Sequence, residues 1–177
     1  MEFNKSVSNP MLAGSIELVK AEDTPEHRNM FVTELTKAVL LSPAIVDPAP
    51  EEDDQGNYKP APGSKVQFPM LSAPDGKRFF MAFTDRREYE AWQEKNQKMP
   101  YFALKFEEYA AMLLGRAPAG AGPAAGFVIN PFGANIVVPR EMVAGIMAAR
   151  AAQAGHGTQM QGRPAAPSGP GGPGRPS

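Results

Sequence analysis

The stretch GFVINPFGANIVVP, residues 126–139, is the most patterned part of the chain and decides how its fold is interpreted. Two apolar runs, 126–129 and 135–138, flank a connection made of turn-forming residues, and Pro139 ends the second run. Aromatic and β-branched residues on both sides of an Asn-Pro-x-Gly turn are typical of a hairpin. We therefore predict two strands joined by residues 130–134.

Each residue type in this turn has a structural use. Asn130 can start the turn by bonding the backbone two residues on, and Pro131 presets φ for the next position. Gly133 is predicted to take the left-handed conformation that closes the loop, and Phe132 to fold back onto the sheet. In the alternative interpretation, a rigid turn presents Phe132 or Asn130 to a partner. Asn130, Phe132 and Gly133 are accordingly the candidate binding residues.

Working outward from the hairpin, apolar periodicity predicts further helices and strands. Asn9, Thr24 and Asp85 precede helical patterns as N-caps, and Glu88 follows Asp85 at the spacing of a capping box. The closing helix is predicted to bury four apolar residues: Met142, Val143, Ile146 and Met147. The predicted helices are 10–20, 25–38, one after Asp85, 106–113 and 140–153, and the predicted strands are 39–46, 65–71, 78–83 and 101–104.

This order of elements favours an α/β (α+β) fold in a single domain, with a mixed β-sheet of about five or six strands and helices packed on it. A doubly wound nucleotide fold would alternate strands and helices regularly, which this chain does not do. The length of 177 residues also suggests one domain. We expect an N-terminal helix within 1–23 and the domain itself within 24–153.

Three segments are rich in Pro, Gly or acidic residues and are predicted to be flexible. Residues 154–177 contain seven Gly and five Pro, so that too little apolar surface is present to offset the entropy of ordering them. They are predicted to form a disordered tail. The acidic segment 47–63 and the Gly/Pro/Ala segment 115–126 are predicted to be flexible loops.

Composition argues against several classes of partner. The 18 basic and 19 acidic residues give a formal net charge of −1, which argues against a nucleic-acid partner. The sequence has no block of Lys and Arg for a membrane surface and no apolar run of spanning length, so we expect no membrane partner. Without the features of a signal peptide, the expected compartment is the cytoplasm.

The sequence lacks the usual motifs of catalysis. It has no Cys and only two His, His27 and His156, and neither His lies in a catalytic or metal-ligand pattern. The acidic run 51–54 lacks the alternating ligands and central Gly of a calcium loop. We therefore expect no catalytic residue, no metal and no cofactor.

Three segments together carry a family resemblance. Residues 78–92, RFFMAFTDRREYEAW, combine a strand, Phe-Thr, an acidic cap and a helix with Trp, and residues 126–139 form the hairpin described above. Residues 30–41 add a helix that runs into an apolar strand. Over roughly residues 24–150 the chain resembles the SseB protein N-terminal domain family, named for enhanced serine sensitivity. The resemblance implies a bacterial cytoplasmic α/β domain without an established enzyme activity.

Two functions stay open at this point. The favoured one is a non-enzymatic binding or regulatory module that recognises a protein partner. The alternative is a small-molecule-binding protein or enzyme linked to amino-acid (serine) metabolism, with a pocket at the strand ends near Asn130 and Thr84.

Overall fold

The computed structural model describes residues 2–3, 5–52, 54, 58–96, 98–115 and 123–159. These residues form a mixed α+β fold, which confirms the predicted class. Two compact units can be separated, Met1–Ala144 and Gly145–Ser177. In chain order the elements are β1 (Glu2–Phe3), α1 (Pro10–Ala21), α2 (Pro25–Lys37), β2 (Val39–Pro43), β3 (Ile45–Asp47), β4 (Glu51–Glu52), β5 (Tyr58–Lys59), β6 (Lys65–Gln67), β7 (Met70–Ser72), β8 (Arg78–Ala82), α3 (Arg86–Gln93), β9 (Tyr101–Lys105), α4 (Phe106–Leu114), β10 (Gly126–Ile129), β11 (Ile136–Pro139) and α5 (Arg140–Gln159).

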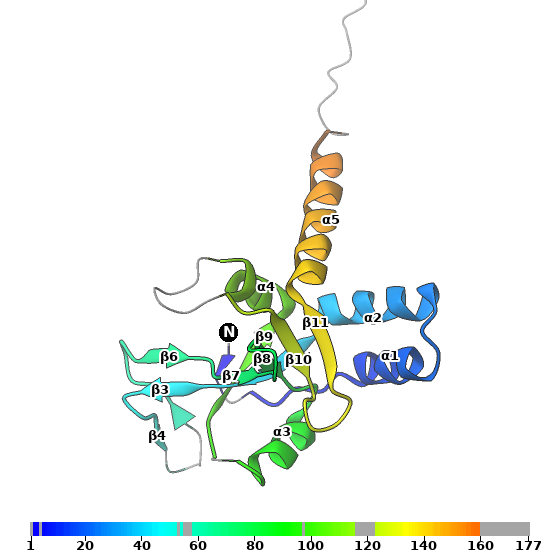
Figure 1. Ribbon diagram of the computed structural model, residues 1–177. Coiled ribbons are helices and arrows are strands. Elements are labelled where there is room, and N and C mark those ends of the chain that lie inside the picture. The colour runs from blue at the N-terminus through cyan, green and yellow to red at the C-terminus, as the bar shows by residue number, and fades with distance from the viewer. Residues whose placement is uncertain are drawn as a thin grey trace, which may run out of the picture. The chain divides into compact units, whose positions relative to one another are not determined.

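Two sheets form the centre of the first unit (Figure 1). One has the order β11-β10-β8-β7, in which β8 and β10 are parallel and both edge strands are antiparallel to their neighbours. The other is antiparallel, in the order β1-β9-β2. Leu41 of β2 and Phe83, directly after β8, exchange backbone hydrogen bonds with N–O distances of 2.9 and 2.8 Å. The two sheets are therefore continuous at this bridge.

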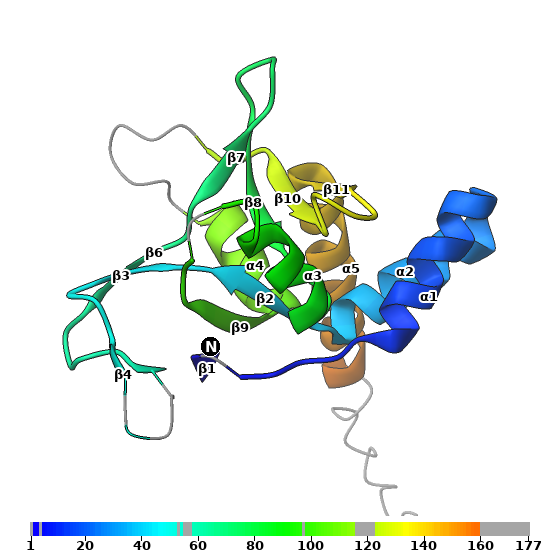
Figure 2. The same cartoon turned by 90° about the horizontal axis from the view of Figure 1, so that it is seen from below.

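Helices α3 and α4 cover opposite faces of the central strands (Figures 1 and 2). On α4, Tyr109 stacks on Phe127 of β10 with ring centroids 4.8 Å apart. On α3, Tyr89 and Trp92 are buried, as the sequence predicted. These two aromatic residues belong to a core cluster whose other buried members are Leu41, Met81, Phe83 and Ala103.

The helical hairpin α1–α2 has the predicted boundaries to within one residue. Thr24 caps α2 as predicted, because its Oγ1 accepts a hydrogen bond from the His27 backbone N–H at 3.2 Å. Asn9 stands at the predicted cap position of α1, but its side chain makes no capping hydrogen bond. Its Nδ2 donates instead to Val39 O and Thr84 O, both at 2.7 Å. Asn9 is therefore confirmed as the N-cap residue of α1, but its side chain does not satisfy an N–H group of the helix.

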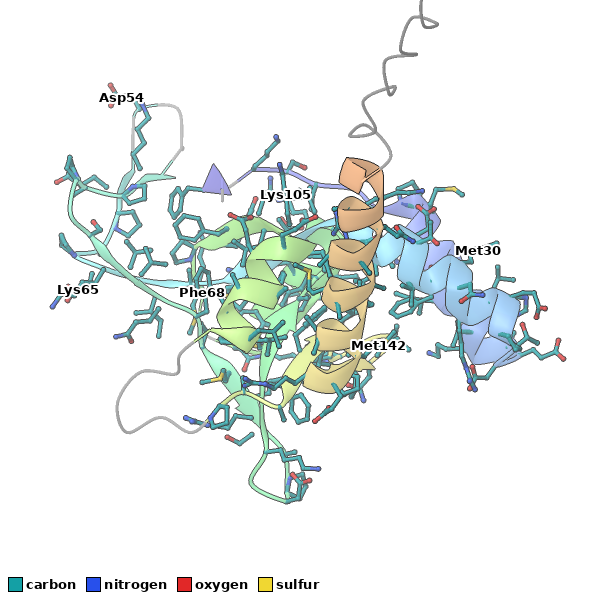
Figure 3. The ribbon with its side chains drawn as sticks, turned by 90° about the horizontal axis from the view of Figure 1, so that it is seen from above. Met30, Asp54, Lys65, Phe68, Lys105 and Met142 are labelled. Carbon is teal, nitrogen blue, oxygen red and sulfur yellow. The ribbon has the colours of Figure 1, made fainter. Side chains whose placement is uncertain are left out.

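Two predicted strands are each divided between two sheets. Segment 39–46 forms β2, which pairs with β9, and β3, which pairs with β6. Segment 65–71 likewise forms β6 and then β7, which pairs with β8. Pro43 and Pro69 lie at or next to the two breaks, and a proline cannot donate to a ladder. Phe68, at the second break and labelled in Figure 3, has its ring edge-to-face to that of Phe102 of β9 with centroids 6.0 Å apart.

The segments predicted to be flexible are partly ordered. The acidic segment 47–63 contains the paired strands β4 and β5, and its residues 53 and 55–57 lie outside the described residues. Helix α5 extends to Gln159, so the predicted disordered tail begins inside a helix. This is reasonable because residues 148–154 are mostly alanine, the strongest helix former. Residues 116–122 and 160–177 lie outside the described residues.

The start of α5 is less buried than predicted. Val143 is fully buried, whereas Met142, Ile146 and Met147 are only half-buried. The prediction that all four belong to the core is therefore wrong for three of them. In the part of the chain that the structure describes, no helix combines the length and the apolar character needed to cross a membrane.

Candidate functional site

The candidate site lies where the parallel strands β8 and β10 end. Ala82 and Ile129 are paired in register as the last residues of these strands, and Asn130 N–H donates to Ala82 O at 2.8 Å. The loop 130–135 therefore starts beside Thr84 and the N-terminus of α3. In sheets with parallel strands, the carboxyl ends are the usual place for binding residues.

Asn130 is fixed by its side chain as well as its backbone. Its Oδ1 accepts a hydrogen bond from Thr84 N–H at 3.0 Å, and its Nδ2 donates to Thr84 Oγ1 at 2.9 Å. Both residues are buried, with 6% and 1% of their surface exposed. A buried N–H needs an acceptor, and the amide of Asn130 supplies one. The predicted bond from Asn130 to its own turn is therefore wrong, because the side chain reaches across to Thr84, two residues after β8, instead.

Thr84 is the centre of a network that connects three distant segments. Its N–H is bonded to Asn130, and its carbonyl accepts a hydrogen bond from Asn9, ahead of α1. Its Oγ1 donates to Asp85 Oδ2 at 2.9 Å, while Asp85 Oδ1 accepts from Glu88 N–H at 3.0 Å. Asp85 thus caps α3 as predicted, and the loop 130–135 is linked to that cap through Thr84.

The left-handed backbone positions of this loop are taken by two asparagines and not by its glycine. Asn130 O accepts hydrogen bonds from Gly133 N–H at 2.9 Å and from Asn135 N–H at 2.8 Å. Asn130 and Asn135 have left-handed backbones, with φ of 48° and 52°, whereas Gly133 does not. Asn tolerates this conformation better than other non-Gly residues do. The prediction that Gly133 takes the left-handed conformation is therefore wrong.

Gly133 instead lies close to α3. A side-chain carbon at this position would come within 2.7 Å of Glu88 Oε2. This is closer than real contacts allow, so a larger residue would displace the Glu88 carboxylate or move the loop. Gly133 and Glu88 therefore bring the loop next to the first turn of α3.

Phe132 points away from the core. It is 55% exposed, so the prediction that it folds back onto the sheet is wrong. Val137 on β11 is 49% exposed and was not a predicted site residue. No sequence signal singled out Val137, because residues 136–138 are all apolar and either set of alternate side chains could have faced the core. The hairpin thus carries two large apolar side chains in contact with solvent.

Charged groups near the loop are partly paired with one another. On α3, Arg86 Nε donates to Glu90 Oε1 at 2.6 Å, and this hydrogen bond raises the pKa of Arg86. Among the described residues, no three His, Cys, Asp or Glu side chains lie close enough to hold a metal ion. The arrangement offers an apolar surface on a fixed backbone.

Comparison with known families identifies the domain. The family model described as SseB protein N-terminal domain matches residues 12–145. The chain belongs to this family. The match begins within α1 and ends within α5, so the SseB domain includes both the candidate loop and the α1–α2 hairpin. Neither the curated proteins nor the solved structures contain a match to the chain.

Proposed function

We propose that this SseB domain is a non-enzymatic binding or regulatory module that recognises a protein partner through the loop 130–135. The observation that carries the proposal is the 55% exposure of Phe132 on a loop whose first residue is buried and hydrogen-bonded. A few residues carry most of the binding energy of a protein interface, and aromatic side chains are frequent among them because one ring buries a large apolar area. Phe132 is the anchor, and Asn130 and Gly133 are the residues that position it.

The fixed backbone supports recognition because it lowers the cost of binding. Ordering a loop on association costs free energy that is subtracted from the affinity. In this loop, Asn130 O already holds Gly133 and Asn135, and the Asn130 side chain holds Thr84. The position of the Phe132 backbone is therefore set before any partner arrives.

The alternative of a small-molecule site near Asn130 and Thr84 has less support. Both side chains are buried and bonded to each other. A ligand that used them would have to break these hydrogen bonds and replace them. The exposed side chains of Phe132 and Val137 give this region apolar surface beside the exposed Arg86–Glu90 pair, and such surface on a rigid frame favours a protein partner.

The test compares Phe132→Ala with the matched control Ile45→Ala. Ile45 is 46% exposed and lies on β3, in a different sheet from the loop. Wild-type and variant domains are immobilised, proteins captured from a native lysate are quantified by mass spectrometry, and the affinity of the purified partner is then measured. We expect Phe132→Ala to weaken that affinity by about 2 kcal/mol or more, and Ile45→Ala to leave it unchanged.

Thermal unfolding of both variants provides the stability control. Because Phe132 is more than half exposed, its truncation should cost well below the roughly 3–5 kcal/mol of a buried Phe. Equal capture by the two variants would contradict the proposal. Loss of capture together with loss of folding would assign Phe132 a structural role instead.

A further inference from the structure

Strand β11 is an edge strand with exposed backbone groups. Among the residues that the structure describes, it pairs with β10 alone. Arg140 N–H donates to Ala125 O at 2.8 Å, so this pair of residues is hydrogen-bonded across the ladder. In an antiparallel ladder, bonded and non-bonded positions alternate along each strand. Val137, three residues before Arg140, therefore directs its N–H and C=O away from β10.

The outward groups of β11 have no backbone partner among the residues that the structure describes. They are the N–H and C=O of Val137 and the C=O of Pro139, which has no N–H to offer. Pro139 therefore ends any further pairing at its side of the edge. At its other end, β11 begins at Ile136, directly after the loop that carries Phe132.

The opposite edge of the same sheet is protected differently. Strand β7 is enclosed by Pro69 and Pro74, and its last residue, Ser72, is polar and exposed. Prolines and polar side chains are common devices against strand pairing at an edge. On β11, the residue whose N–H and C=O both face outward is Val137, which is β-branched and 49% exposed. Of these two edges, β11 is the one suited to pairing.

We infer that the β11 edge accepts an extended peptide segment of a protein partner as an additional strand. The segment pairs with the outward groups of Val137, and its alternate apolar side chains contact Val137 and Phe132. Main-chain hydrogen bonds provide affinity in this mode, and the side chains of the receiving strand provide selectivity. The inference rests on the proposed function and names the class of partner.

The size of the surface selects a peptide over a second copy of this chain. The exposed parts of Phe132 and Val137 amount to on the order of 150 Å² of apolar area. A stable interface between folded proteins needs about 800 Å² from each partner. A strand of about six residues needs far less, because it pairs its backbone with the edge. The occupant is therefore a short extended segment.

The experiment selects peptides of about twelve residues from a random phage-displayed library on the immobilised wild-type domain, a length that comfortably exceeds one strand. We expect the selected peptides to alternate β-branched or aromatic residues with polar ones. A synthetic peptide of the consensus sequence should slow amide hydrogen exchange at Val137 by at least about tenfold. Methylation of the peptide nitrogens that face β11 should weaken binding by about tenfold per hydrogen bond.

Two variants of the domain complete the test. Val137→Pro removes the outward N–H and should lose about tenfold in peptide affinity, whereas Val137→Thr keeps the N–H and the shape and should stay within about threefold. If Val137→Pro does not fold, the hydrogen-exchange and peptide-methylation measurements on the wild-type domain still show whether a peptide pairs with β11. No enrichment of peptides, a helical spacing of apolar residues in them, or an unchanged Val137 amide would overturn the inference.

The outcomes separate this inference from the proposed function. If Phe132→Ala abolishes partner capture but the Val137 amide stays unprotected in the complex, recognition through the loop stands and strand addition fails. If the Val137 amide is protected while Phe132→Ala has no effect, the edge binds without the loop and the proposed function fails. Slow amide exchange at Val137 in the absence of peptide, together with a dimer detected by analytical ultracentrifugation, would identify a second copy of the chain as the occupant. This result would overturn the inference that the occupant is a peptide.

Discussion

Replacement of Asn130 by alanine should destabilise the domain far more than the same replacement at Asn135. Both residues have a left-handed backbone, with φ of 48° and 52°. They differ in their side chains, because Asn130 is buried and bonded to Thr84 twice, whereas Asn135 is exposed. The comparison therefore isolates the side-chain hydrogen bonds from the cost of the backbone conformation.

The magnitude follows from the contacts. Alanine pays roughly 1 kcal/mol for the left-handed conformation at either position. At Asn130, the substitution also leaves the buried Thr84 N–H without an acceptor, which costs about 1–3 kcal/mol. Loss of the second bond, to Thr84 Oγ1, adds about 1 kcal/mol. We expect about 3–5 kcal/mol for Asn130→Ala and about 1 kcal/mol for Asn135→Ala.

Urea unfolding followed by fluorescence of Trp92 measures both values, with the slope of the transition as a check on two-state behaviour. Asn130→Gly is the third variant, because glycine removes the backbone cost and keeps the loss of hydrogen bonds. The destabilisation by Asn130→Gly should lie between those of Asn130→Ala and Asn135→Ala. Equal destabilisation by Asn130→Ala and Asn135→Ala would refute the role of the buried amide in fixing the loop.

Two further predictions concern α4 and the cap of α3. Burial raises the pKa of the Tyr109 hydroxyl. Above a pH of about 10 the unfolded state therefore loses the hydroxyl proton while the folded state keeps it, so the free energy of unfolding should fall as the pH rises further. Tyr109→Phe should reduce the dependence of this free energy on pH, measured by urea unfolding at alkaline pH. An unchanged pH dependence in Tyr109→Phe would show that other groups cause the loss of stability at alkaline pH. Asp85→Ala removes the cap and the bond to Thr84 and should cost about 1–2 kcal/mol, while Glu90→Ala on the same helix should cost at most about 0.5 kcal/mol because its ion pair with Arg86 is exposed. Unfolding midpoints of similar value for these two variants would contradict this assignment.

Much of the fold was predictable because local signals agreed with the tertiary structure. Thr24 and Asp85 cap helices as their sequence positions indicate, and the apolar spacing 106–113 places its four residues in the core. Strand pairing was less accessible, because pairing depends on contacts between distant residues. Nothing in segment 39–46 alone indicates that its halves pair with β9 and β6, which lie in different sheets.

The candidate loop shows where sequence reasoning stops. Asn, Pro and Gly marked the turn correctly, but residue type does not determine which of them takes the left-handed conformation. The acceptor for Thr84 N–H comes from 46 residues further along the chain, so no local pattern contains it. Exposure of Phe132 was undecidable for the same reason, since a turn aromatic can fold inward or outward according to what surrounds it.

The construction of this loop itself supports a role in recognition. Two antiparallel strands can be joined by a two-residue turn, at little cost in backbone strain. Here the connection runs from Asn130 to Asn135, uses two left-handed non-glycine residues and buries a polar side chain that needs its own partner. The left-handed backbones cost free energy, and the buried side chain of Asn130 would cost more if Thr84 were not placed to bond it. Departures from the simplest local solution tend to occur at functional positions. The side chain that this arrangement holds in solvent is Phe132, and the removal of that ring is accordingly the substitution expected to change binding while leaving the fold intact.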